Sequence, residues 1–215
     1  MYTPDAFKEP RTEVLHELVR KFPLATLVIP NLEDFEINHL PMVMRQDTAS
    51  RGTLVGHVPK ANTVWKLMDG RTRAAAVFQG ASAYITPSWY PSKHEHGRAV
   101  PTWNYAVVHA RGTPHVVDDQ RWLFAHLEEL TDTLESNQAL PWKVSDAPQD
   151  FTDRMVNQLV GIEMPIDAIE GKWKTSQNRP QADQMGVVAG LKSRGDGESL
   201  AMAELIALSS HPNRR

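Results

Sequence analysis

The sequence predicts a mainly β protein with added helices, an α+β chain organised around one β-barrel. About seven short runs of apolar and β-branched residues are separated by turn residues, a pattern typical of barrels rather than of βαβ sheets. Segments with apolar residues at helical spacing interrupt and follow these runs. The chain has 215 residues, of which 41% are hydrophobic and 23% are charged, and this balance is ordinary for a folded globular protein.

The first two predicted strands are neighbours. Residues 24–29 form an apolar run typical of a buried strand, and residues 35–40 alternate between apolar and polar side chains. Asn31, Glu33 and Asp34 lie between them and are suited to a turn. The two segments are therefore expected to pair.

The remaining strands are predicted in three places. Residues 52–58 form a short strand, and residues 73–79 and 82–86 are expected to form a hairpin around the Gly-Ala pair between them. Residues 102–117 predict a long strand that bends near a glycine and a proline. Residues 162–176 supply at least one further strand.

Helices are predicted over residues 14–22, 62–68, 123–134, 151–159 and 200–208. Asn62 is suited to cap the second helix, and either Asp118 or Asp119 the third. Gly161 is interpreted as the stop of the fourth helix. Residues 193–197, Ser-Arg-Gly-Asp-Gly, are typical of a flexible linker.

The domain organisation follows from this pattern. Residues 1–192 are expected to form one barrel domain with inserted helices, and residues 193–215 a linker and a C-terminal helix. The first residues lack the basic and apolar regions of a signal peptide, and no apolar run approaches the roughly 20 residues that span a bilayer. The chain has no cysteine, which excludes disulfides and thiolate chemistry. These features favour the cytoplasm.

The charge balance argues against direct DNA binding. The chain carries 23 Lys and Arg against 26 Asp and Glu, a formal net charge of −3. DNA-binding proteins usually show a basic footprint, because contacts with phosphates supply much of their affinity. Here the small basic clusters are residues 71–73 and Arg214 with Arg215. DNA therefore stays a candidate partner that the charge does not support.

Two neighbouring segments combine aromatic, hydroxyl, amide and ammonium groups with prolines. They are residues 87–93, Pro-Ser-Trp-Tyr-Pro-Ser-Lys, and residues 101–105, Pro-Thr-Trp-Asn-Tyr. Flat aromatic faces and a few fixed polar groups suit a pocket for a planar, polar ligand. The alternative is a proline-bounded pair of strands whose aromatic residues cap a core. Both interpretations stay open on chemistry alone.

Several sequence blocks resemble those of one bacterial family, the PaiB-like FMN-binding negative transcriptional regulators. The blocks are residues 1–4, 39–41, 56–57 with 61–62 and Trp65, 87–93, 100–105, 171–174 and 176–179. They fall in order over nearly the whole chain, and the order and spacing together make the resemblance specific. It implies a split β-barrel of the pyridoxamine-phosphate-oxidase-like type, forming homodimers with FMN at each end of the subunit interface.

The resemblance also assigns candidate residues to the phosphate of FMN. His57, Lys60 and Asn62 lie at a predicted strand-to-helix junction, and each can donate to phosphate. The alternative is that Asn62 only caps a helix, Lys60 is solvated and His57 is an ordinary core histidine.

The resemblance places three further sets of residues beside the flavin ring. His39, in a run expected to end its strand, would lie alongside the flavin. Trp89, Thr102, Trp103 and Asn104 would stack on the ring and bond to it. A late strip from the partner subunit would complete the site with Lys174, Ser176, Gln177 and Asn178.

Three functions compete at this point. The first is an FMN-binding regulator whose effect on transcription can be indirect. The second is a flavin-dependent oxidoreductase of the flavin-reductase kind, and the third is a flavin-binding dimer without chemistry. No catalytic residue stands out, and His94 with His96 is too small a cluster to predict a metal site. Rossmann and P-loop glycine motifs do not occur in the sequence.

Overall fold

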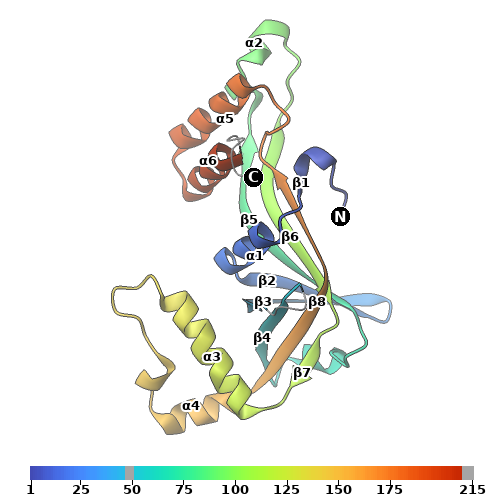
Figure 1. Cartoon of the computed structure of the whole chain (residues 1–215), viewed down its shortest axis with the longest axis vertical. Coiled ribbons are helices and arrows are strands. Elements are labelled where there is room, and N and C mark those ends of the chain that lie inside the picture. The colour runs from blue at the N-terminus through green and yellow to red at the C-terminus, as the bar shows by residue number, and fades with distance from the viewer. Residues whose placement is uncertain (47–50, 210–215) are drawn as a thin grey trace. The chain divides into compact units, whose positions relative to one another are not determined.

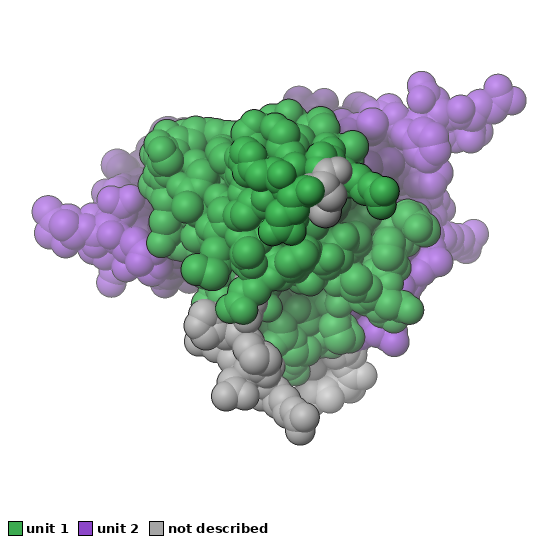
Figure 2. All heavy atoms as spheres, turned by 90° about the horizontal axis from the view of Figure 1, so that it is seen from above, with its two compact units in different colours: residues 1–18, 79–108, 170–215 green, residues 19–78, 109–169 purple. Residues whose placement is uncertain are grey.

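The computed structural model describes residues 1–46 and 51–209. Within them the chain divides into two compact units, coloured separately in Figure 2. Unit 1 comprises residues 1–18, 79–108 and 170–215, and unit 2 comprises residues 19–78 and 109–169. The predicted division into residues 1–192 and 193–215 stays a prediction.

The strands are β1 (Lys8–Glu9), β2 (Leu24–Asn31), β3 (Asp34–Arg45), β4 (Thr53–Pro59), β5 (Ala74–Ile85), β6 (Thr102–Gly112), β7 (His115–Val117) and β8 (Leu159–Lys174). The helices are α1 (Thr12–Lys21), α2 (Ser92–His96), α3 (Gln120–Glu135), α4 (Gln149–Val156), α5 (Gln181–Arg194) and α6 (Gly197–Ser209) (Figure 1). Four 3₁₀ turns complete the described elements: η1 (Asp5–Phe7), η2 (Thr63–Leu67), η3 (Pro87–Trp89) and η4 (Val144–Asp146). The strands pair in the order β1-β8-β4-β3-β2-β5-β6, while β7 pairs with β8 and β8 also pairs with β6.

In unit 2, β3 changes partner along its length. It pairs antiparallel with β2 from Asp34 to Pro41 and with β4 from Met42 onward. Pro41 lies where β3 changes partner. Proline has no backbone N–H to donate, so it disrupts the strand pairing least at such a position. The expectation that residues 39–41 end a strand is therefore wrong, because β3 continues to Arg45.

The predicted hairpin at residues 73–86 is also wrong. The structure has one strand there, β5, of 12 residues. Gly80 is not a turn residue and is absent from the glycines with positive φ. A Cβ at Gly80 would lie 3.0 Å from Leu18 Cδ1, so the glycine allows close packing within unit 1.

Gly161 likewise serves packing and does not stop a helix. The fourth helix, α4, ends at Val156, and Gly161 lies inside β8. A Cβ at Gly161 would approach the Trp122 ring to 2.5 Å, so the indole needs this glycine. Sequence reasoning could not distinguish a glycine that ends an element from one that makes room for a ring.

Unit 1 contains a helix that the sequence did not predict, α5. Its sequence has little amphipathic pattern and contains Gly186 and Gly190. It packs with α6 on a buried cluster that includes Ile85, Tyr90 and Met202. The expected flexible linker is a tight connection, in which Gly195 adopts a φ of 76° and α6 begins two residues later.

The other predicted helices and strands have counterparts in the structure, of which the one near residues 62–68 is the 3₁₀ turn η2. The strand over 24–29, the helix over 14–22 and the strand over 162–176 correspond to β2, α1 and β8, although the boundaries differ by a few residues. The bend in the predicted long strand separates β6 from β7. Among the described residues, none of the helices is both long and apolar enough to cross a membrane.

Candidate functional site

Four of the predicted ring-side residues form one polar group in unit 1. Thr102 and Asn104 are two positions apart on β6, so their side chains lie on the same face of that strand. The Asn104 amide donates to Ser176 Oγ at 2.8 Å, and the Lys174 ammonium donates to Thr102 Oγ1. The structure therefore brings together residues separated by 72 positions in the sequence.

One atom of this group has no partner. Asn104 is 1% exposed, and its Oδ1 accepts no hydrogen bond from any described group, whereas its Nδ2 is bonded to Ser176. A buried carbonyl oxygen without a donor costs free energy, so such an atom needs an explanation. Asn104 Oδ1 is an acceptor and the nearby Lys174 ammonium is a donor. Together they fit a ligand that offers both a donor and an acceptor.

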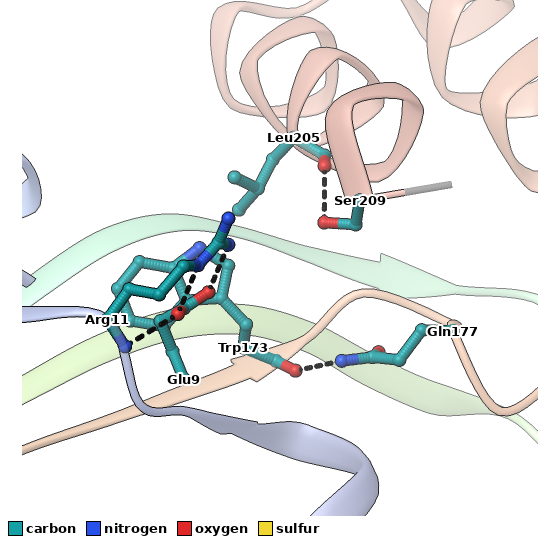
Figure 3. Close-up of polar contacts among 6 residues, drawn as sticks. All are labelled: Glu9, Arg11, Trp173, Gln177, Leu205 and Ser209. Carbon is teal, nitrogen blue, oxygen red and sulfur yellow. Dashed lines mark hydrogen bonds and ion pairs between the residues drawn. The ribbon is translucent and has the colours of Figure 1, made fainter. Parts of the chain in front are cut away.

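The chain segment after β8 is held in an uncommon conformation. Ser176 has a φ of 61°, in the left-handed region that disfavours residues with a Cβ. The side-chain oxygen Oε1 of Gln177 accepts from the Thr175 N–H at 2.7 Å. The side-chain nitrogen of Gln177 donates to the Trp173 backbone carbonyl (Figure 3). Gln177 thus fixes the turn that presents Ser176, whereas Asn178 is exposed.

The two tryptophans of the aromatic segments have different surroundings. Trp103 is half exposed, and its ring centroid lies 6.2 Å from that of Tyr84. Trp89 packs on α5, because a Cβ at Gly190 would lie 2.3 Å from its ring, and the Arg194 guanidinium is 4.7 Å from the ring centroid. Trp103 is therefore the more accessible surface for stacking, and the assignment of Trp89 to the flavin stays a prediction.

The predicted phosphate-side residues lie close in sequence in unit 2, but their side chains have different neighbours. Asn62 caps η2 by accepting from the Val64 N–H at 3.1 Å, and it donates to the Asn38 amide oxygen at 2.7 Å. The Lys60 side chain is exposed. Asn62 therefore caps a helical turn, as the alternative interpretation expects. A role of these three residues toward phosphate stays a prediction.

His57 belongs to a polar cluster under α3 that sequence reasoning missed. Its Nδ1 lies 3.1 Å from Nε2 of His126, and the His126 ring stacks on Trp122 with centroids 5.2 Å apart. His126 is fully buried, and its Nδ1 has no partner among the described atoms. The helical spacing of residues 123, 127, 130 and 134 gave no signal for this histidine.

Burial determines the protonation of the two rings. Desolvation lowers the pKa of His57, and desolvation together with the charges of His57 and Arg45 lowers the pKa of His126 to about 4. Both rings are therefore neutral near pH 7, when one ring nitrogen can donate to the other. The pair holds α3 on β4.

Charged residues surround this pair. Arg45 lies over the Trp122 ring at 5.3 Å and forms ion pairs with Glu129 at 2.7 Å and with Glu163 at 3.7 Å. The Trp122 indole N–H donates to Glu163 at 2.8 Å.

His39, the remaining ring-side candidate, lies on β3 and is exposed. His94 is exposed on α2, and the side chain of His96 lies outside the described part of the chain.

Solved structures similar to this chain show its fold. The FAD- and heme-binding protein of Mycobacterium smegmatis matches with a TM-score of 0.57 and 14% identity, over 78% of this chain and 73% of the other. A conserved hypothetical protein of Mycobacterium tuberculosis matches with a TM-score of 0.58 and 11% identity, over 84% and 95%. The chain thus has a split-barrel fold of the pyridoxamine-phosphate-oxidase-like type.

Sequence comparison then gives the particular family. The model described as "Putative FMN-binding domain" matches residues 1–168, and the chain belongs to this family, whose flavin is FMN. The protease synthase and sporulation protein PAI 2 of Bacillus subtilis is 26% identical over 206 residues, and 96% of each chain is covered. An uncharacterised protein of Emericella nidulans is 29% identical over 241 residues, again with 96% of each covered. The chain is a PaiB-like homologue.

Proposed function

We propose that this protein is an FMN-binding homodimer, and that the polar group in unit 1 holds the flavin ring. The observation that carries the proposal is the buried, unpaired Oδ1 of Asn104 beside Thr102, Lys174 and Ser176. The pyrimidine edge of oxidised FMN carries one N–H donor between two carbonyl acceptors. Asn104 supplies the acceptor for the N–H, and Lys174 supplies a donor for a carbonyl.

The other candidate residues take supporting roles in this proposal. Trp103 offers a half-exposed aromatic face to the ring, and Gln177 keeps Ser176 in its left-handed turn. His57, Lys60 and Asn62 remain assigned to the phosphate, with Lys60 the freest of them because its ammonium is exposed. The cysteine-free sequence fits a cytoplasmic protein.

A titration of FMN into flavin-free protein tests the ring site, with quenching of flavin fluorescence as the readout. Lys174→Met should weaken binding about tenfold or more, since it removes a charge-assisted hydrogen bond. Lys192→Met is the matched control, because Lys192 is an exposed lysine on α5 of the same unit. Equal affinities of the two variants would place the ring elsewhere.

A second variant tests the aromatic face of Trp103 and the acceptor oxygen of Asn104 together. Trp103→Ala with Asn104→Ala should abolish flavin binding while the far-ultraviolet circular dichroism stays that of the wild type. Asn104 is buried, so its replacement affects packing as well as the ligand. Trp103→Ala alone is therefore measured beside the double variant as the milder change. Unchanged affinity in the double variant would contradict the site.

We propose further that any effect on transcription is indirect or requires a protein partner. The name of the Bacillus relative refers to protease synthesis and sporulation, and the net charge of this chain is −3. Arg71 and Arg73 are exposed, but Arg73 is paired with Asp167 at 2.5 Å, and Arg214 and Arg215 lie outside the described residues. Neutralising several phosphates would need more clustered cations than these.

The DNA question is tested by titrating the purified protein against its own promoter region at about 0.15 M salt, near physiological ionic strength. Equal, weak binding to the promoter and to random DNA is expected. Nanomolar binding that prefers the promoter would overturn the indirect role and leave the flavin proposal intact.

A further inference from the structure

The segment over residues 118–157, here called the α3–α4 arm, exposes apolar side chains that no described part of the chain covers. On α3, Leu123 and Leu130 are buried in unit 2, but Leu134, which continues the same stripe, is half exposed. Beyond α3, Leu140 is 91% exposed and Trp142 is 47% exposed. Figure 1 shows α3 and α4 joined by this long connection, which leaves the body of the sheet.

The second helix of the arm repeats this arrangement. Thr152 and Val156 are the buried face of α4, whereas Phe151 and Met155, one position earlier in each case, are about half exposed. Their spacing of four residues places them side by side on the helix. Large apolar side chains therefore stand exposed on both helices and on the connection between them, which is typical of an interaction surface.

The arm is strongly acidic. It carries nine carboxylates and three Lys or Arg residues: Asp118, Asp119, Glu128, Glu129, Asp132, Glu135, Asp146, Asp150 and Asp153 against Arg121, Lys143 and Arg154. Some of these charges are used internally, since Glu129 pairs with Arg45 and Asp150 with Arg154. Glu128 and Asp132 are exposed and unpaired among the described residues.

The carboxylates and the apolar stripe lie next to one another on α3. At 100° per residue, Glu128, Asp132 and Glu135 fall in one row beside the row of Leu127 and Leu134. The connection is not loose, because the Trp142 N–H donates to Glu135 Oε2 at 3.1 Å. The arm thus presents fixed apolar groups edged by negative charge.

We propose that the α3–α4 arm docks a basic amphipathic segment of another protein. Apolar residues of the segment would cover Leu140, Trp142 and Phe151, and its lysines or arginines would face Glu128 and Asp132. Aromatic anchors with a charged rim are the usual design of such surfaces. The same charges repel nucleic acid and anionic lipid, so a polyanion does not fit this surface.

The test uses full-length protein and a fluorescein-labelled synthetic peptide of 18 leucines and lysines at amphipathic helical spacing. Fluorescence anisotropy measures binding at about 0.05 and 0.15 M salt, which changes the screening length. Wild-type protein should bind the peptide, and the same peptide with glutamates in place of lysines should not bind. Absence of binding to the basic peptide would overturn the proposal.

Two sets of variants locate the contact on the arm. Leu140→Ser with Trp142→Ser should weaken binding about tenfold or more, as expected for the loss of an aromatic anchor. Glu128→Gln with Asp132→Asn should weaken it less and reduce its salt dependence. If neither set changes the affinity, the arm is not the docking surface.

A second exposed apolar site gives the matched control. Leu200 and Leu208 on α6 are exposed beside Glu198 and Glu204, so this helix face resembles the arm in composition. Leu200→Ser with Leu208→Ser should leave peptide binding unchanged, and an equal loss would show nonspecific attraction. Conversion of a dimer to a monomer by the arm variants would assign the arm to contacts between copies and overturn the proposal.

FMN affinity, measured on the same arm variants, should stay that of the wild type. The docking proposal and the flavin proposal can therefore fail independently, because one is read from the peptide and the other from the flavin.

Discussion

His126 shows most clearly how a single residue departs from its ordinary chemistry in this fold. It is fully buried, stacked on Trp122 and 3.1 Å from His57, and its pKa falls to about 4. The unfolded chain would bind a proton at His126 below about pH 6.5, while the folded chain would not do so until about pH 4. In that window the unfolded state binds more protons, so stability rises with pH and falls on acidification.

We predict that the free energy of unfolding of the wild type falls between pH 7 and pH 4.5 by up to roughly 3 kcal/mol through this group. His126→Leu should lose much of this dependence, although it also removes a hydrogen bond. Urea denaturation at a series of pH values measures it. His94→Gln, at an exposed histidine, is the control and should keep the wild-type slope. An unchanged slope in His126→Leu would show that the pair does not set the acid response.

Gly190 is a residue whose role only its neighbour explains. Alanine normally favours a helix over glycine by about 1 kcal/mol. Here a Cβ would lie 2.3 Å from two atoms of the Trp89 ring, closer than any real contact, so the substitution must displace the ring or the helix.

We therefore predict that Gly190→Ala destabilises the protein by about 1–3 kcal/mol, as overpacking does, and shifts the urea midpoint downward. Gly197→Ala is the matched control, because a Cβ there meets nothing within 4 Å. A neutral or stabilising Gly190→Ala would mean that Trp89 is loosely held and free for another role, including the flavin.

At the scale of the element, α3 shows how one cap anchors a helix. The sequence left Asp118 and Asp119 as equal candidates, and the structure selects Asp119, whose carboxylate accepts from the Trp122 N–H at 2.9 Å. This first turn also positions Trp122 against Gly161 of β8. A weaker cap should therefore loosen the packing of the indole.

We predict that Asp119→Ala destabilises the protein by about 1 kcal/mol, the usual value of such a cap. Asp118→Ala should change stability by a few tenths of a kcal/mol at most, because Asp118 is exposed and makes no capping bond. Thermal unfolding of the two variants measures the difference. Equal effects of the two substitutions would show that the capping bond of Asp119 does not stabilise α3.

For the whole molecule, we predict a homodimer. The exposed apolar residues Leu24, Leu32, Phe35 and Ile37 all lie on β2, β3 and their turn, and small barrels often cover such surface with a two-fold partner. Light scattering at micromolar concentration should give twice the chain mass of 24.2 kDa. A single species at the chain mass would count against the dimer and against a flavin site shared by two subunits.

The sequence by itself determined the periodic elements and the family. Alternating and helical patterns are local, so β2, α1, α3 and the cap at Asn62 could be predicted from neighbours along the chain. The order of short sequence blocks resembles that of the FMN-binding family to which the chain belongs. The resemblance assigns residues 102–104, Lys174 and residues 176–178 to one site.

Only the tertiary structure decided which glycines turn the chain and which make room for a side chain. Gly80, Gly161 and Gly190 look alike in the sequence, but each lies against a side chain distant along the chain. The same holds for the pairing of Asn104 with Ser176 and of His57 with His126, which are 72 and 69 positions apart. Burial and the charges of His57 and Arg45 lower the pKa of His126, and burial leaves Asn104 Oδ1 unpaired. Both effects depend on what surrounds a group in space.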